Sequence, residues 1–410
     1  MAHILMINLP AEGHVNPTVG LVKELTARGE QVTYYCTEDF RERLEKAGAV
    51  VRTYDNYLAQ MPEGGPSSIG TDPRQMMNFM LHGAETMVQH ILPEVREETY
   101  DYVVYDSMCI GGWIIADILG LPKVCSSTTF IMGPEMHDMM PPQMKERFQP
   151  DTESELYRKS QEPVQRMERE FGLDLSSLQH VMGIVSHPGD LSIVFTSRKF
   201  QFAGERFDET YRFVGPSIAD RSNSGDFPLE ALDGQFVIYI SMGTVFNDLQ
   251  EFYKTCFEAF RDTDAKVVLS IGRKVKIEDL PEPPANFLVR SYVPQLEVLQ
   301  HTDIFFTHGG MNSTSEGLYY GVPLALLPVS ADQPMVAGRV ASFGAGIALD
   351  HSQVTPELLR ETAEKLRADA SFKEKAEELG ASLREAGGAA QAAEEIIRWS
   401  RTLEPQTQQH

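Results

Sequence analysis

The chain has 410 residues, enough for roughly two domains with a full hydrophobic core each. Hydrophobic residues make up 42% and charged residues 23%, which is the composition of an ordinary globular protein. The formal net charge of -23 argues against binding to nucleic acid or anionic lipid through general electrostatics.

The first half of the chain alternates between strand and helix patterns. Residues 3–9 read as a buried strand, and Asn16 followed by Pro17 predicts the start of a helix that ends at Gly29. Further strands are expected over residues 31–36, 49–54, 102–105 and 123–126, with helices over 41–46, 74–98 and 112–119. This alternation predicts a parallel sheet with helices on both faces.

Residues 132–170 interrupt the alternation, and a strand at 191–196 resumes it. The polar run "SIADRSNSGDFP" is typical of a linker. A second series follows, with strands at 236–241, 266–271, 287–291, 304–307 and, as the last one, 324–327, a helix at 249–260 and a helical C-terminal stretch. We therefore expect an α/β protein with two Rossmann-like, doubly wound domains.

The four cysteines are scattered and form no C-x-x-C pair, which favours reduced thiols and a cytoplasmic location. The apolar N-terminal run has no basic residues before it and is too short for a signal sequence. No apolar segment reaches about 18 residues, so no membrane insertion is expected.

The stretch "FFTHGGMNSTSEGLYYGVP" predicts an anion site in the second half. His308 to Gly310 form a turn after a strand, and Asn312 or Ser313 is placed to cap the helix that follows. The N-terminus of that helix faces the carboxyl edge of the sheet, where a phosphate is a natural ligand. Taken alone, His-Gly-Gly is equally typical of a plain tight turn.

Three other polar segments belong to the same edge. They begin at Ser241, Tyr292 and Asp332, and each follows a predicted strand of the second half. Because the carboxyl ends of parallel strands share one edge, these segments can converge on one ligand.

Here a family resemblance becomes visible. The run "VPQLEVLQHTDIFFTHGGMNSTSEGLYYGVPLALLPVSADQ" resembles the nucleotide-sugar signature of the UDP-glycosyltransferase superfamily. Over nearly its whole length the chain is similar to bacterial macrolide-type glycosyltransferases, which also glycosylate flavonoids and other phenols. The resemblance implies a GT-B fold of two facing domains, with an acceptor domain at 1–215, a linker at 216–232, a UDP-sugar domain at 233–385 and a C-terminal helix at 386–410 that crosses back.

The resemblance also implies how the nucleoside is bound. Tyr292 would stack on the uracil, and the backbone of Val293 would bond the base. Gln295 and Glu316 would bind the ribose. A carboxylate suits this role because it can accept hydrogen bonds from two hydroxyl groups. Without the resemblance, Tyr292 also fits ordinary packing at the end of a strand, and Glu316 also fits a capping residue near the start of a helix. Many plant members have Trp at the position of Tyr292, so base discrimination here can be looser.

The remaining donor contacts follow from the same resemblance. His308 and Ser241 fall at phosphate-contacting positions, and Gly310, Asn312 and Ser313 fall at the helix N-terminus that holds the diphosphate. Asp332 and Gln333 match the pair that binds the sugar hydroxyls.

The first domain is expected to supply the base. His14 follows the first strand, in a predicted loop, and a histidine can take a hydroxyl proton near neutral pH. Asp106, at the end of the fourth strand, can orient its imidazole. The family pattern places a base histidine and an aspartate at these positions. An isolated strand-end Asp also fits a helix cap.

These assignments predict an inverting, metal-independent transfer of a hexose, most simply glucose, from a UDP-sugar to an apolar hydroxylated acceptor such as a macrolide, a flavonoid or another phenol. The UDP-sugar is a co-substrate, and no further cofactor or metal is expected. The D-x-D of Asp262 to Asp264 lies at the amino edge of the sheet and fits a surface turn.

The acceptor is suggested by methionines 132, 136, 139, 140 and 144, because methionine suits adaptable apolar surfaces, although it also fills cores. A monomer or weak dimer is expected. Two alternatives remain: an enzyme of the same fold that modifies the sugar nucleotide itself, such as an epimerase, and a non-catalytic nucleotide-sugar sensor, which would not need His14 and Asp106.

Overall fold

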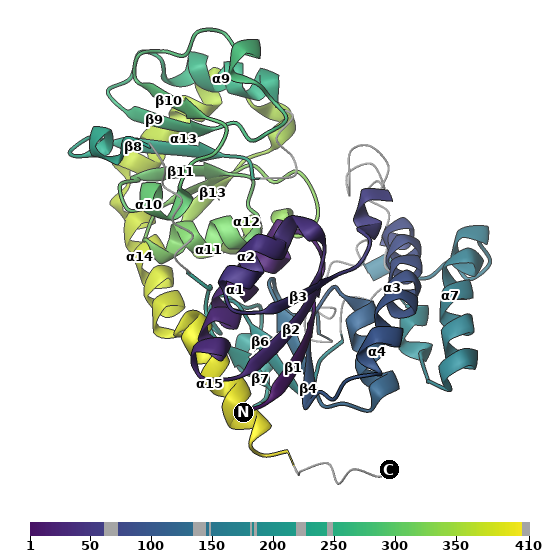
Figure 1. The fold of residues 1–410 in the computed structure, drawn as a ribbon. Coiled ribbons are helices and arrows are strands. Elements are labelled where there is room, and N and C mark those ends of the chain that lie inside the picture. Colours follow the sequence, from purple (N-terminus) through teal and green to yellow (C-terminus); the bar gives the residue numbers. More distant parts are fainter. Residues whose placement is uncertain are drawn as a thin grey trace. The chain divides into compact units, whose positions relative to one another are not determined.

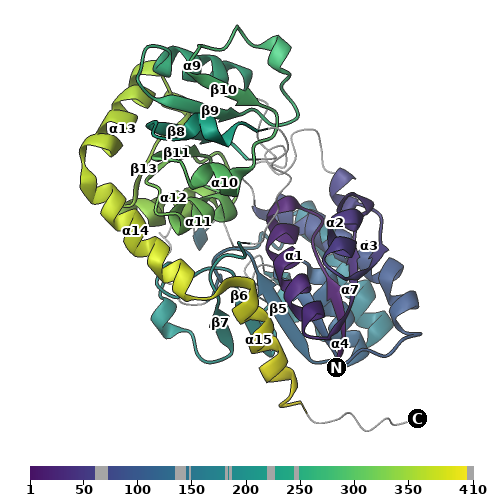
Figure 2. The same cartoon turned by 60° about the vertical axis from the view of Figure 1, so that its left-hand side comes forward.

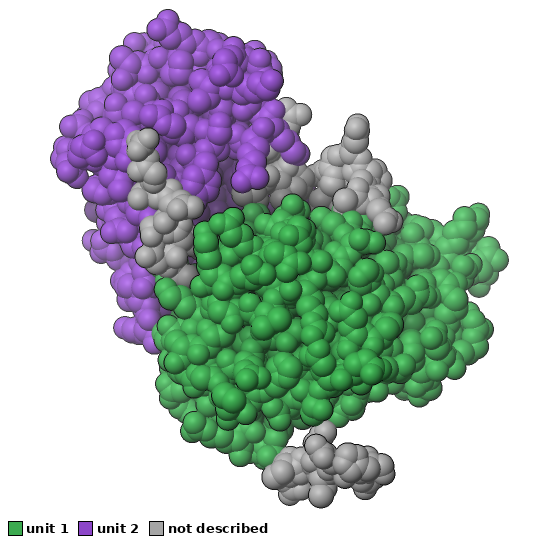
Figure 3. Space-filling view, in the orientation of Figure 1, with its two compact units in different colours: residues 1–219, 386–410 green, residues 220–385 purple. Residues whose placement is uncertain are grey.

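The chain folds into two compact units (Figure 3). The computed structural model describes residues 1–60, 73–133, 145–146, 149–180, 183, 187–218, 227–243 and 249–403. Unit 1 comprises Met1–Ala219 and Ala386–His410, and unit 2 comprises Asp220–Glu385. Part of the predicted linker (219–226) and four of the five clustered methionines (136–144) lie outside the described residues.

Unit 1 is built on a seven-stranded parallel sheet with the order β3-β2-β1-β4-β5-β6-β7 (Figure 1). Its strands are β1 (His3–Ile7), β2 (Gln31–Cys36), β3 (Val50–Thr53), β4 (Tyr102–Asp106), β5 (Lys123–Ser127), β6 (Leu191–Val194) and β7 (Tyr211–Phe213). The strand order reverses between β1 and β4, which is where doubly wound sheets bind ligands.

Helices cover both faces of this sheet because successive side chains of a buried strand point to opposite sides. Ile4 and Met6 of β1 pack in a cluster with α1 (Glu12–Ala27), α2 (Arg41–Lys46) and the C-terminal helix α15 (Gly388–Ser400). Leu5 and Ile7 face the other cluster, with α3 (Pro73–Val95), α4 (Ile110–Leu119) and α7 (Glu155–Phe171). Figures 1 and 2 show α15 beside α1 in both views.

Unit 2 repeats the design with a six-stranded parallel sheet, ordered β10-β9-β8-β11-β12-β13. Its strands are β8 (Val237–Ser241), β9 (Lys266–Ser270), β10 (Phe287–Arg290), β11 (Ile304–Thr307), β12 (Leu324–Leu326) and β13 (Gly346–Ala348). Here the order reverses between β8 and β11.

One face of the second sheet packs under two helices, α9 (Gln250–Phe260) and α13 (Pro356–Ala368). Ile238 and Ile240 of β8 belong to that cluster. The remaining helices of this unit are α10 (Gln295–Leu299), α11 (Met311–Tyr319), α12 (Gln333–Ser342) and α14 (Ala370–Glu385). The loops at the carboxyl ends of β8 and β11 lead into the expected donor segments.

The structure confirms the predicted fold of two doubly wound parallel α/β domains. Two edge strands, β7 and β13, were not predicted, so the prediction of residues 324–327 as the last strand was wrong. Both are only three residues long, which is too short to show an alternating pattern. In the described part of the chain, no helix combines the length and the hydrophobicity needed to cross a membrane.

Candidate active site

His14 and Asp106 form a hydrogen-bonded pair at the reversal point of the first sheet. The pairing of Ile7 with Tyr105 places the ends of β1 and β4 at the same level. His14 Nδ1 lies 2.9 Å from Asp106 Oδ2. The His14 side chain is 21% exposed, whereas that of Asp106 is fully buried. This is the arrangement of an accessible imidazole oriented by a buried carboxylate.

The carboxylate of Asp106 is itself held in place. Its second oxygen, Oδ1, accepts the backbone N–H of Met108 at 2.9 Å. The Thr128 hydroxyl, beyond the end of β5, lies 3.4 Å from His14 Nδ1. Since an ionised carboxylate only accepts hydrogen bonds, the pair favours the tautomer with a proton on Nδ1 and a lone pair on Nε2.

The prediction that α1 starts at Asn16 and leaves His14 in a loop was wrong. The helix begins at Glu12, with Ala11 as its N-cap, so His14 lies in its first turn. The Val15 N–H donates to the Ala11 carbonyl at 2.9 Å, which starts the helix without a side-chain cap. Asn16 instead accepts a hydrogen bond from Arg43 at 2.5 Å, and the helix continues through Pro17.

A buried polar network supports the turn that carries His14. Asn8 Nδ2 donates to the His14 carbonyl at 3.1 Å and to the Tyr34 hydroxyl at 2.6 Å. The Thr18 hydroxyl lies 2.7 Å from that of Tyr34 and donates to the Val15 carbonyl at 2.8 Å. These side chains were not predicted. A polar residue directly after a buried strand, as Asn8 is, was the available signal.

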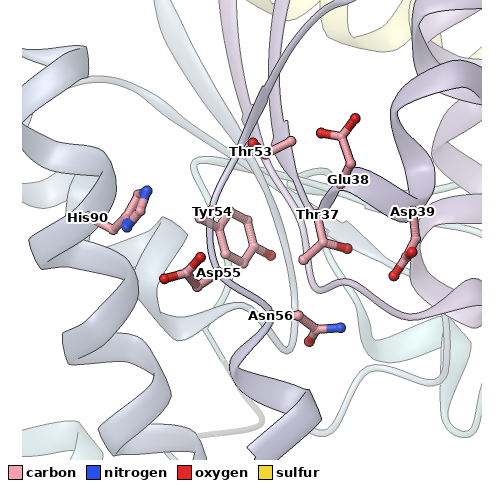
Figure 4. Close-up of a pocket in the computed structure, with 8 residues that line it drawn as sticks. All are labelled: Thr37, Glu38, Asp39, Thr53, Tyr54, Asp55, Asn56 and His90. Atoms are coloured by element: carbon pink, nitrogen blue, oxygen red, sulfur yellow. The ribbon is translucent and has the colours of Figure 1, made fainter.

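A polar pocket of about 410 Å³ lies at the same edge of unit 1, beyond β2 and β3 (Figure 4). Tyr54 lines it, and the Tyr54 hydroxyl donates to the backbone carbonyl of Asn8. The pocket is therefore tied to the network beneath His14. Its lining residues are Thr37, Glu38, Asp39, Thr53, Tyr54, Asp55, Asn56 and His90.

In unit 2, a helix N-terminus follows directly after β11. The N-cap of α11 is Gly310, so the prediction of Asn312 or Ser313 as the cap was wrong. Both lie instead in the first turn. A glycine N-cap supplies no side-chain oxygen, and the helix itself does not use the N–H groups of its first turn. Such an end suits an anion.

His308 is packed between two glycines. A Cβ atom added to Gly243 would lie 2.6 Å from the imidazole of His308, and one added to Gly310 would lie 2.4 Å from it. Burial lowers the pKa of His308 from 6.5 to about 4. Without a bound anion the imidazole is therefore neutral at pH 7, so it offers a ring N–H rather than a full positive charge.

The two side chains expected to meet the ribose contact each other. Gln295 Nε2 donates to Glu316 Oε2 at 2.6 Å and lies 3.4 Å from the Ser313 hydroxyl. Glu316 is 2% exposed. The structure thus brings three predicted donor residues into one group, from the start of α10 and the first two turns of α11.

Three further residues predicted to bind the nucleoside or the phosphates, Tyr292, Val293 and Ser241, lie at or just beyond the ends of strands in unit 2. Tyr292 is 63% exposed just beyond β10, as a stacking platform requires, and the adjacent Val293 is buried. Ser241 is the last residue of β8, and its register partner is Thr307, next to His308.

Asp332 and Gln333 lie at the start of α12, after a constrained loop. Asp332 is the N-cap of α12, and Ala331 before it has a positive φ of 57°. The side-chain oxygen of Gln333 accepts the backbone N–H groups of Val329 and Ser330, at 2.8 and 3.2 Å. The amide oxygen of Gln333 thus holds the loop before α12.

The D-x-D sequence lies in the turn between α9 and β9. The carboxylate of Asp264 pairs with Arg367 at 2.8 Å. That turn precedes β9, so it belongs to the amino edge of the sheet.

Comparison with known proteins identifies the family. Residues 254–397 match the family described as "Erythromycin biosynthesis protein CIII-like, C-terminal domain". The chain is 40% identical to "Uncharacterized UDP-glucosyltransferase YojK" of Bacillus subtilis (strain 168), over 97% of both chains. It belongs to the macrolide-type UDP-glycosyltransferases. The enzyme is also 35% identical to "NDP-glycosyltransferase YjiC" of the same organism, over 96% of both chains.

Solved structures of this family agree with the fold of the enzyme. The calicheamicin glycosyltransferase CalG4 is 27% identical, with a TM-score of 0.84 over 99% of this chain and all of that one. The predicted GT-B class is thereby confirmed, and the enzyme is a UDP-dependent glycosyltransferase. Its individual site residues remain predictions.

Proposed function

We propose that the enzyme transfers glucose from UDP-glucose to a hydroxyl group of an apolar small molecule, with inversion and without a metal ion. The observation that carries this proposal is the 2.9 Å bond between His14 Nδ1 and the buried carboxylate of Asp106. A non-catalytic sensor has no need for such an oriented base. An epimerase would differ by needing no alcohol acceptor.

In this mechanism, His14 Nε2 takes the proton of the acceptor hydroxyl. The acceptor oxygen forms a bond to the anomeric carbon while the bond from that carbon to the diphosphate oxygen breaks. UDP leaves from the opposite face, so one displacement inverts the configuration. Asp106 keeps the imidazole in the required tautomer and stabilises the imidazolium that forms.

Unit 2 supplies the groups suited to the donor. Tyr292 stacks on the uracil, with the backbone of Val293 at the base edge, and Gln295 and Glu316 bind the ribose. The N-terminus of α11 and the ring N–H of His308 stabilise the negative charge that develops on the leaving diphosphate. Asp332 and the amide of Gln333 bind the sugar hydroxyls. Macrolides, flavonoids and other phenols are the proposed acceptors, and the cytoplasm is the proposed location.

Incubation of the enzyme with UDP-glucose and a panel of phenols and macrolides, read by mass spectrometry, tests the proposal. The expected result is an acceptor heavier by one hexose unit, with a β-linkage from an α-linked donor. Conversion of UDP-glucose to another UDP-sugar without any acceptor would favour the epimerase alternative. Tight UDP-glucose binding with no turnover on any acceptor would favour the sensor.

A further inference from the structure

A buried tyrosine contacts the pair of side chains, Gln295 and Glu316, that is proposed to bind the ribose. Tyr239 is the middle residue of β8 and is 1% exposed. Its hydroxyl donates to Gln295 Oε1 at 3.0 Å, and Gln295 Nε2 donates to Glu316 Oε2 at 2.6 Å. Side chains from β8, α10 and α11 therefore form one chain of hydrogen bonds that leads from Tyr239 to the carboxylate of Glu316.

The position of this phenol is fixed by the sheet. Tyr239 and Phe305 are register partners on the two central strands, β8 and β11. Their rings stack with centroids 4.7 Å apart and an interplanar angle of 8°. Because both rings are buried in a packed core, the hydroxyl of Tyr239 is a rigid reference point for the side chains that reach it.

The chain of bonds also fixes the orientation of the Gln295 amide. Turning the amide over would set Gln295 Oε1 against Glu316 Oε2, and two acceptors repel each other. In the observed orientation, the phenol satisfies the amide oxygen and the amide NH₂ holds one oxygen of Glu316. The carboxylate is thereby set in one direction before any ligand arrives.

We propose that Tyr239 is a positioning residue that makes the donor site selective for ribonucleotides over 2′-deoxyribonucleotides. This inference rests on the proposed function, because it takes Glu316 as the ligand of the ribose. A carboxylate can accept hydrogen bonds from both hydroxyls of a vicinal diol only when it faces them squarely. A 2′-deoxyribose offers one hydroxyl fewer, so it gains less from the fixed carboxylate.

The test is calorimetric binding of UDP and 2′-deoxy-UDP to the wild type and to Tyr239→Phe, which removes only the hydroxyl. We expect the wild type to prefer UDP by about 10-fold or more, the usual worth of a hydrogen bond to a charged group. In Tyr239→Phe the affinity for UDP should fall by about 5-fold or more, and that for 2′-deoxy-UDP should change little. The preference for UDP should therefore nearly vanish.

Tyr253→Phe is the matched control. Tyr253 is a second fully buried tyrosine of unit 2, and its hydroxyl donates to the backbone carbonyl of Ile271 at 3.1 Å, in the core under α9. This variant should keep the wild-type preference for UDP even if it loses some stability. An equal loss of preference in both variants would overturn the inference, because it would show a general effect of removing buried hydroxyls.

The remaining outcomes separate the inference from the proposed function. Equal losses of affinity for UDP and 2′-deoxy-UDP in Tyr239→Phe would contradict the proposed role of Tyr239 but not the proposed function. Glu316→Gln is expected to lose the same preference. If it kept that preference while Tyr239→Phe lost it, the assignment of Glu316 to the ribose would be wrong. Failure of the wild type to bind UDP would overturn the proposed donor site itself.

Discussion

At the scale of single residues, the chemistry depends on side chains that are held by their neighbours. One carboxylate oxygen of Asp106 is hydrogen-bonded to His14, and the other accepts the backbone N–H of Met108. Gln333 has its amide oxygen on two backbone N–H groups of the loop before α12. In both cases, bonds within the unit set the direction of a group before any substrate is present, which is what preorganisation requires.

Ala331 is expected to carry backbone strain. Its φ of 57° lies in the left-handed region, which a side chain with Cβ occupies at a cost of about 1–2 kcal/mol. We expect Ala331→Gly to relieve this strain and to stabilise unit 2 by up to about 1 kcal/mol. The greater entropy that glycine gives the unfolded chain offsets the rest of the relieved strain. Urea unfolding measures the change. Ala381→Gly, within α14, should instead destabilise by about 1 kcal/mol, and a stabilisation in both would contradict the explanation.

His187 is expected to make the protein sensitive to acid. Burial, with a smaller effect of Lys123, lowers the pKa of this 6%-exposed imidazole from 6.5 to about 4. Between pH 6.5 and 4, His187 is therefore protonated in the unfolded chain but neutral in the folded protein. The contribution of His187 to the free energy of unfolding should therefore fall by about 3 kcal/mol as the pH drops from 6.5 to 4.

This effect is measured by urea unfolding across that pH range in the wild type and in His187→Phe, which keeps a flat ring for the stack on Trp113. The variant should lose less stability on acidification than the wild type. His82→Gln removes an exposed histidine and should follow the wild-type curve. Parallel curves for His187→Phe and the wild type would contradict this explanation.

At the scale of elements, β2 fixes the start of α1 through one hydroxyl. Tyr34 accepts a bond from Asn8 and lies 2.7 Å from the hydroxyl of Thr18, and the three side chains are at most 2% exposed. A buried network in which each member is satisfied makes a local arrangement rigid. The first turn of α1, with His14 in it, is therefore set by the sheet beneath it.

We expect Tyr34→Phe to destabilise unit 1 by about 1–3 kcal/mol, because buried partners lose their hydrogen bonds. It should also lower kcat more than it raises KM, since His14 is loosened but no substrate contact is removed. Tyr35→Phe is the control on the same strand, since the hydroxyl of Tyr35 bonds Glu94 and Arg52 near the surface. Equal effects of the two variants on kcat would argue against a special role of the network.

The sequence allowed most elements to be predicted, and the failures have identifiable causes. Buried parallel strands such as β2 and β11 were found with the observed bounds, because β-branched and aromatic residues are enriched in them. The starts of α1 and α11 were missed because neither helix has a side-chain cap. The pairing of Asn16 with Arg43 spans 27 residues, and no local rule reveals it.

From the residues alone, the candidate site could be predicted only near the ends of strands, whereas Gln295 and Glu316, which lie in helices, were assigned through the family resemblance. His14 and Asp106 were proposed as partners because β1 and β4 end at one edge, and the structure places them 2.9 Å apart. Tyr239 gave no such signal, because it lies in the middle of a strand between two isoleucines, where an aromatic residue fits ordinary core packing. The low pKa of His308 depends on packing around it, which the sequence does not state.

At the scale of the whole molecule, each unit carries one part of the proposed reaction, and both parts lie at the reversal point of a parallel sheet. Unit 1 has the pair of His14 and Asp106, and unit 2 has the N-terminus of α11 with His308 beside it. In the sequence, the two histidines follow the first strand of unit 1 and strand β11 of unit 2, respectively.

The proposed donor site uses a helix N-terminus in place of a metal ion. We therefore expect EDTA to leave the rate of glucose transfer largely intact. The measurement compares product formation in chelator with that after Mg²⁺ or Mn²⁺ is added back, and Asp264→Asn serves as a control at the D-x-D turn. Loss of turnover in EDTA that Mg²⁺ restores would show that a metal ion takes part in the reaction.

The central claim, that His14 is the general base, is tested most directly by the transfer rate of His14→Ala with acceptors of different acidity. The account predicts a fall of about 10²–10⁴-fold with a weakly acidic alcohol, with UDP affinity nearly unchanged because His14 and the donor residues lie in different units. The loss should shrink for acidic phenols, which are already partly ionised in mildly alkaline buffer. A His14→Ala variant that glycosylates a weakly acidic alcohol at the wild-type rate would contradict the account.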